Sequence, residues 1–143
     1  MTTTNSLEHA NTLAKPPVFN PPGVWYSRVR CFQATVTLAS QAVGDDIVLF
    51  LLPAGFRPAY GVVASGVSVA GSKLSIGTSD EAGKYRALAD GPAADVPQLF
   101  GIVAATRDPL AASETVRLKV ETGGAALPAS GSLVVRLFGT GAD

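Results

Sequence analysis

The sequence predicts an all-β fold, an antiparallel sandwich or barrel of about eight strands. Short apolar or alternating runs recur at fairly regular spacing along residues 24–143. Turns that contain glycine or proline separate these runs. The apolar period of a long helix is missing, and Gly91, Pro92 and Pro97 interrupt the segment 87–99, where a helix would otherwise be considered.

The first 23 residues differ from the rest of the chain. Two proline pairs, Pro16-Pro17 and Pro21-Pro22, fix φ and remove four backbone donors, so this stretch cannot join the middle of a sheet. It favours extended polyproline geometry instead. We therefore expect residues 1–23 to form a Pro-rich N-terminal arm and residues 24–143 to form the β domain.

Two interpretations of the arm stay open. It is either a disordered tail or an extended arm that lies across a neighbouring subunit, with Val18 and Phe19 as apolar anchors. A stiff segment loses less entropy when it docks, which favours the second. Directly after the arm, aromatic residues stand beside two arginines, a composition typical of a protein-binding hot spot and equally of a first strand that covers the core. The candidate interface residues are therefore Val18, Phe19, Trp25, Tyr26, Arg28 and Arg30.

The first three predicted strands cover residues 25–38, 47–52 and 61–69. Residues 32–38 alternate, with threonines on the outer face. The run 47–52, Ile-Val-Leu-Phe-Leu-Leu, is apolar on both faces. A strand of an antiparallel sandwich does not need two apolar faces. We therefore expect a loop, a second element or another subunit to cover its outer side.

Five further strands follow at 74–77, 85–88, 99–104, 115–121 and 133–138. The clearest is 115–121, in which Val116, Leu118 and Val120 share one face and charged residues occupy the other. This period of two is expected where one sheet face is packed and the other is wet. Turn residues such as Gly71-Ser72 and Gly123-Gly124 bound the shorter runs.

Composition limits the possible partners. The chain has 11 basic and 11 acidic residues and a net charge of zero, so we expect neither direct nucleic-acid binding nor attraction to a membrane surface. No apolar run approaches the roughly 18 residues that span a bilayer. Charged residues make up 15% of the chain, below the roughly 25% of ordinary soluble domains. We therefore expect neighbouring subunits to cover part of the surface.

Candidate catalytic residues are few. The one histidine, His9, falls in the leader without an orienting partner, as a general base requires. The one cysteine, Cys31, is predicted to be a small buried hydrophobic residue rather than a reactive thiol. The acidic pairs Asp45-Asp46 and Asp80-Glu81 are expected in solvated turns, because the spaced ligands of a calcium loop are missing. We predict no enzyme, no cofactor and no metal site.

One stretch of the chain resembles a known family. The stretch 43–57 contains a strand that ends in Leu52-Pro53-Ala54-Gly55, and the stretch 73–90 runs from Leu-Ser-Ile-Gly-Thr through an acidic turn and Tyr85 to Asp90. This pattern, over roughly residues 42–90, resembles small virion proteins of tailed bacteriophages. Those of known structure look like jelly-roll cement or decoration proteins that trimerise on the capsid surface.

The resemblance implies a jelly-roll-like antiparallel β-sandwich, to which the proline-rich composition of residues 1–23 adds an extended N-terminal arm without a match in the family pattern. It implies the major capsid protein and further copies of the chain, as a homotrimer, as partners, and the capsid surface of a virion as location, after assembly in the host cytoplasm. A head-completion, tail or fibre-associated jelly-roll module that binds a receptor or glycan is the alternative. Asparagines suited to glycan recognition occur only in the leader, at Asn5, Asn11 and Asn20. A cupin-like enzyme would need histidines within the sheet, which the sequence lacks.

Overall fold

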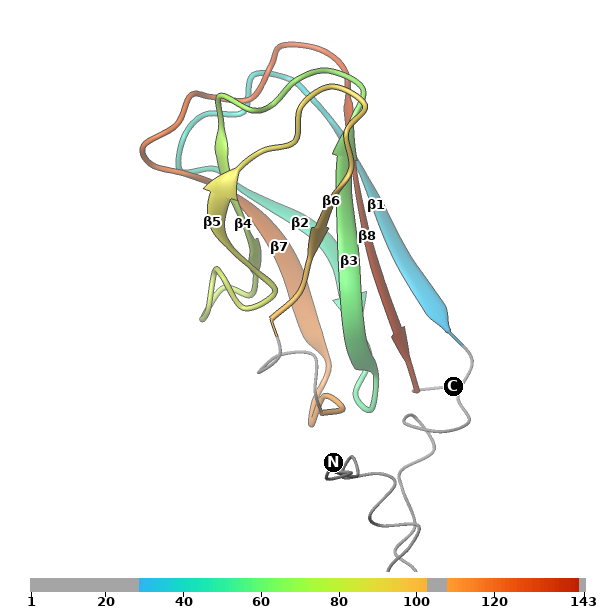
Figure 1. Cartoon of the computed structure of the whole chain (residues 1–143). Helices are drawn as coiled ribbons and strands as arrows, with labels where there is room; N and C mark the ends of the chain where they lie inside the picture. The colour runs from blue at the N-terminus through green and yellow to red at the C-terminus, as the bar shows by residue number, and fades with distance from the viewer. Residues whose placement is uncertain (1–28, 103–107, 142–143) are drawn as a thin grey trace, which may run out of the picture.

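The computed structural model describes residues 29–102 and 108–141 (Figure 1). These residues form strands, turns and loops, without a helix in either described range. The strands are β1 (Arg30–Thr37), β2 (Asp46–Leu52), β3 (Arg57–Ser65), β4 (Lys73–Gly77), β5 (Arg86–Asp90), β6 (Gln98–Phe100), β7 (Glu114–Glu121) and β8 (Ser132–Thr140).

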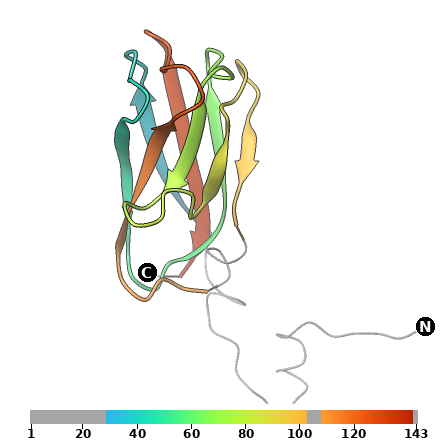
Figure 2. The same ribbon diagram turned by 90° about the vertical axis from the view of Figure 1, so that its left-hand side faces the viewer.

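The strands form two four-stranded sheets that face each other (Figures 1 and 2). Sheet A has the order β1-β8-β3-β6, and sheet B has the order β2-β7-β4-β5. The antiparallel pairs β1–β8, β2–β7, β3–β6 and β4–β5 are nested, as in one long ribbon of paired strands that has been rolled up. This is the topology of a jelly roll. The predicted β-sandwich of eight strands is confirmed.

The core lies between the two sheets. From sheet B, Val116, Leu118 and Val120 are fully buried, and their counterparts in β8 of sheet A are Leu133, Val135 and Leu137. The alternation predicted for residues 115–121 is thus confirmed, since the residues between these three are only half-buried. The core is completed by side chains from both sheets and from the loops: Val36, Leu38, Leu52, Phe56, Val63, Val69, Leu74, Ile76, Tyr85, Phe100 and Leu127.

The third strand was predicted at the wrong place. It was expected over residues 61–69, but β3 begins at Arg57 and ends at Ser65. Pro58 reads as a strand breaker in the sequence, yet the structure places it beside a register shift between Pro58 and Tyr60, where the ladder is already irregular. After Ser65 the chain turns away, and the Ser65 hydroxyl accepts a hydrogen bond from the amide of Val67.

Other strands differ from the prediction mainly at their ends. Strand β6 covers Gln98–Phe100 rather than 99–104, and residues 103–107 are not among the described residues. Strand β1 begins at Arg30, whereas residues 25–28 of the predicted first strand lie outside the described range. Strand β8 extends beyond the predicted 133–138 at both ends.

Candidate interaction surface

The outer faces of the two sheets differ in chemistry. On sheet B the outer face is largely polar and charged, apart from the edge strand β2. The Lys73 ammonium lies 2.8 Å from a carboxylate oxygen of Asp90, and an Arg117 nitrogen lies 3.7 Å from a carboxylate oxygen of Asp46. This is the ordinary solvated face of a sandwich.

The outer face of sheet A is mainly apolar. Cross-strand pairing arranges its residues in three rows, which we call the apolar face: Cys31, Phe138 and Tyr60; then Gln33, Arg136, Val62 and Leu99; then Thr35, Val134 and Ala64. Within this set Arg136 is the one charged residue. An apolar patch of this kind on a sheet indicates an interaction site.

An aromatic pair lies at one end of the apolar face. The rings of Tyr60 and Phe138 are stacked, with centroids 5.1 Å apart and an angle of 21° between their planes. Tyr60 remains 47% exposed and Leu99, one row further along, 76% exposed. Both side chains therefore offer surface that a partner can bury.

Arg136 lies in the middle row of this face. Its Nε donates a hydrogen bond to the side-chain oxygen of Gln33, 2.9 Å away, which limits the freedom of the guanidinium. Beyond it, Arg136 and Val134 line a shallow depression of about 610 Å³, together with Asp95 and Pro97 from the segment between β5 and β6. The apolar face is therefore hollowed at the end opposite the aromatic pair.

The outer side of strand β2 is also apolar. Its Val48 is 58% exposed and its Leu51 is 61% exposed. The sequence led us to expect that a loop, another element or another subunit covers this side. No loop or strand in the described ranges covers either side chain, so the expected cover is not found among those residues.

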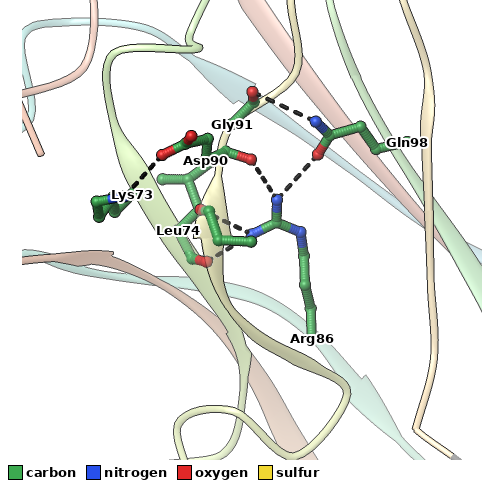
Figure 3. Close-up of polar contacts among 7 residues, drawn as sticks. Lys73, Leu74, Arg86, Asp90, Gly91 and Gln98 are labelled. Carbon is green, nitrogen blue, oxygen red and sulfur yellow. Dashed lines mark hydrogen bonds and ion pairs between the residues drawn. The ribbon is translucent and has the colours of Figure 1, made fainter.

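A buried arginine joins the free edges of the two sheets. Arg86 on β5 is 7% exposed and points into the space between β5 and β6. Figure 3 shows its guanidinium among neutral oxygens: one nitrogen donates to the carbonyls of Leu74 and Ala89, and the other to the Asp90 carbonyl at 2.6 Å and to the Gln98 side chain at 2.9 Å.

The charges around this cluster affect each other. Burial lowers the pKa of Arg86 from its usual value, and the nearby Asp90 carboxylate opposes that shift. The hydrogen bond and charge of Lys73 hold the pKa of Asp90 below its usual range. Since all four acceptors of Arg86 come from the protein itself, the cluster is a structural link between the sheets rather than a ligand site.

A second polar link involves Tyr85 and Glu114. The buried Tyr85 hydroxyl donates a hydrogen bond to Glu114, and the Lys84 ammonium lies 2.7 Å from the other carboxylate oxygen. Burial, followed by the hydrogen bond to Glu114, raises the pKa of Tyr85 well above its usual value. Tyr85, which belongs to the sequence pattern of residues 73–90, is therefore a buried residue whose hydrogen bond to Glu114 stabilises the β4–β5 hairpin.

The role of the candidate interface residues stays a prediction. Val18, Phe19, Trp25, Tyr26 and Arg28 lie outside the described residues, as does His9. Arg30 lies at the start of β1, where its guanidinium carbon is 5.4 Å from the centroid of the Phe32 ring. The structure thus neither brings these residues together nor separates them.

The prediction for Cys31 was wrong. It was expected to be buried, but it is exposed in the first row of the apolar face. The reason is the phase of β1, in which Phe32 takes the inward position and contacts Phe50 and Phe56. Its neighbour Cys31 therefore points outward.

Asp45, Asp80 and Glu81 lie outside the strands and are exposed, as predicted, whereas Asp46 is the exposed first residue of β2 rather than part of a turn. Asp45 accepts a hydrogen bond from the amide of Ala42, and Asp80 and Glu81 are exposed. Across the described ranges, no group of three or more His, Cys, Asp or Glu side chains is placed to hold a metal ion. The same residues include no helix of the length and apolarity needed to cross a membrane.

Comparison with known proteins shows a similarity of fold to two solved structures. No family model matches the chain, and no curated protein matches it. Among solved structures, a chain of the capsid of Ralstonia phage GP4 is similar, with a TM-score of 0.64 and 21% identity over 81% of this chain and 86% of that one. A chain of the capsid asymmetric unit of cyanophage Pam1 is similar too, with a TM-score of 0.61 and 17% identity over 96% and 97%. The chain therefore shares its fold with chains found in two bacteriophage capsids.

Proposed function

We propose that this protein is a structural, non-enzymatic component of a bacteriophage virion, and that it acts as a cement or decoration protein on the outer surface of the capsid. The observation that carries this proposal is the similarity of fold to chains of two phage capsids, over 81% and 96% of the sequence. The family resemblance of residues 42–90 points the same way.

The surface of the molecule supports a role in assembly. The apolar face on sheet A and the exposed Val48 and Leu51 on sheet B give it two sides with surface to bury. The described polar clusters are satisfied internally and serve the fold. A protein of this kind works through the area that it buries with its neighbours.

The proposed mechanism is multivalent attachment. The chain assembles with copies of itself as a homotrimer and binds the major capsid protein where capsid subunits meet. Each contact is modest, but simultaneous contacts raise the overall affinity by orders of magnitude. A ring of three copies has the symmetry of a local threefold position of the shell. The Pro-rich arm of residues 1–23, with Val18 and Phe19, extends the reach of each copy, and the remaining candidate interface residues, Trp25, Tyr26, Arg28 and Arg30, follow it directly.

The test uses capsids of the phage that encodes this chain, prepared without it. We expect the purified protein to cosediment with these capsids and to raise their melting temperature. A protein that neither binds nor stabilises them is not a cement protein. In a parallel assay, binding to purified tails or to a glycan array, without capsid binding, would support a tail-associated or receptor-binding module instead.

A further inference from the structure

We propose that the apolar face of sheet A is a docking site for residues 16–26 of a second copy of this chain. The inference rests on the proposed function for its biological setting, since it describes how copies of the protein join. It concerns contacts between copies, whereas the proposed function concerns contacts with the capsid. The two are therefore tested separately.

The chemistry of the face fits a proline-rich peptide. Polyproline segments dock on aromatic surfaces, where rigid rings pack against proline rings at little entropic cost. The stacked Tyr60 and Phe138 form such a surface, and the exposed Leu99 and half-buried Val62 extend it. In the same row the guanidinium of Arg136, hydrogen-bonded to Gln33, is available to stack on an aromatic side chain.

The segment 16–26 has the matching composition. Its sequence, Pro-Pro-Val-Phe-Asn-Pro-Pro-Gly-Val-Trp-Tyr, contains four prolines, three aromatic residues and no charge. The apolar face can bury these side chains, and Trp25 is suited to the Arg136 guanidinium. The charged outer face of sheet B is a poorer match, because it would desolvate the ions of Lys73, Asp90 and Arg117.

The position where the chain leaves the described structure indicates a second copy rather than the same one. Val29 is 71% exposed and precedes β1 at the end of sheet A that carries the aromatic pair. To cover its own face, the segment would have to reverse within residues 26–29, Tyr-Ser-Arg-Val, where Ser27 is the one residue typical of turns and Gly, Pro, Asn and Asp are missing. If it instead continues outward, ten extended residues span roughly 30 Å, enough to reach a neighbour.

This arrangement explains how a closed assembly forms. Each copy gives one segment and receives another at a different surface, so the contact is heterologous, and it forms a ring if the rotation between neighbouring copies closes. Such a ring uses the apolar face fully and leaves the outer face of sheet B free. It also accounts for the low charge content of the chain, since both partners of the contact are nearly uncharged.

The single cysteine allows a direct test. Cys31 is exposed in the first row of the apolar face, so it can report what lies there. One full-length copy carries Phe19→Cys with Cys31→Ser, and an affinity-tagged wild-type copy supplies Cys31. After mixing, a short bismaleimide cross-linker should join the two copies. The control carries Asn5→Cys with Cys31→Ser, in the polar start of the chain, and should cross-link at least tenfold less.

Each outcome decides the question. Efficient cross-linking between copies at position 19 but not at position 5 supports the proposal. Equal yields at both positions, or no yield at either, overturn it. Cross-linking of Phe19→Cys to Cys31 within one chain, in the variant that keeps Cys31, would mean that the segment covers its own face and would also overturn it.

Sedimentation velocity provides the second measurement. The wild-type protein should form a concentration-dependent oligomer, and Leu99→Ser or Trp25→Ala should weaken its association at least tenfold. Leu88→Ser is the matched control, because Leu88 is 54% exposed on the edge strand of the other sheet. A wild-type protein that stays monomeric, or an oligomer unaffected by both variants, overturns the proposal. A monomer that still cosediments with capsids would overturn this proposal and the homotrimer, and would leave the proposed binding to the capsid intact.

Discussion

The guanidinium of Arg86 donates a hydrogen bond of 2.9 Å to the side-chain oxygen of Gln98, and so joins the edge strand of sheet B to the edge strand of sheet A (Figure 3). The Gln98 amide in turn donates to the carbonyl of Gly91, 3.4 Å away, in the segment that connects the two strands. β6 has only three residues and pairs with β3 alone. The arginine therefore gives this short strand a second attachment.

Replacing Arg86 should lower the free energy of unfolding by more than the loss of one charged side chain normally does. Arg86→Met removes four hydrogen bonds and leaves buried carbonyl oxygens without their donor, so we expect a loss of about 2–4 kcal/mol in the free energy of unfolding. Urea unfolding followed by far-ultraviolet circular dichroism measures this loss. Lys73→Met is the control, since it breaks an exposed ion pair with Asp90 and should change stability little. Equal stability of the two variants would disprove the role of Arg86.

The arginine link also shows the limit of sequence reasoning. Alternation and turn residues predicted eight strands, and the strand 115–121 was predicted to within one residue. In the sequence, however, Arg86 looks like a surface residue near the start of a short predicted strand, residues 85–88. Its partner Gln98 is twelve residues away, across a segment whose path is set by tertiary structure. No local pattern contains that information.

The apolar face was missed for a different reason. In strand β8, Val134 and Phe138 alternate with buried core residues, so residues 133–138 are apolar on both faces apart from Arg136. Apolar residues on both faces of this strand were visible in the sequence, as they were in residues 47–52. The rest of the face comes from β1, from β3, whose position was predicted four residues too late, and from β6. Register across strands cannot be derived from one strand at a time.

A glycine in β3 makes room for the core aromatic Phe100. A Cβ built on Gly61 would lie 2.1 Å from the Phe100 ring, so Gly61→Ala forces the ring or the short β6 strand to move. We expect a loss of about 1–3 kcal/mol in the free energy of unfolding, as in other overpacked cores. Gly66→Ala is the matched control, because nothing lies within 4 Å of a Cβ there. Thermal unfolding of both variants is the measurement, and a stability of Gly61→Ala equal to that of the control would contradict the packing.

The buried Tyr85 predicts a loss of stability at alkaline pH. Its pKa is raised in the folded protein, first by burial and then by the hydrogen bond to Glu114. The unfolded chain therefore releases this proton first, near the usual pKa of about 10, and stability falls as the pH rises above that value. In Tyr85→Phe this contribution is absent. Unfolding measured between pH 8 and 11 should thus show a steeper decline for the wild type than for the variant. Parallel curves would indicate that Tyr85 ionises equally well in both states.

Deletion of residues 1–23 separates folding from assembly. The described core and both sheets come from residues 29–102 and 108–141, so we expect the shortened chain to keep the β-sheet circular dichroism spectrum and to unfold as cooperatively as the full chain. The deletion removes Pro16 to Pro22 with Val18 and Phe19, the greater part of the proposed docking segment.

Cosedimentation with undecorated capsids should therefore show binding weakened by an order of magnitude or more, because losing contacts between copies reduces the number of simultaneous attachments. Replacement of residues 2–14 by a Gly/Ser sequence of equal length is the control, since it keeps the Pro-rich part, and it should leave attachment unchanged. If the deleted chain binds capsids as tightly as the full chain, residues 1–23 take no part in attachment and the arm is a tail. If the control loses binding as well, the polar start of the chain, rather than its proline-rich part, carries the contact.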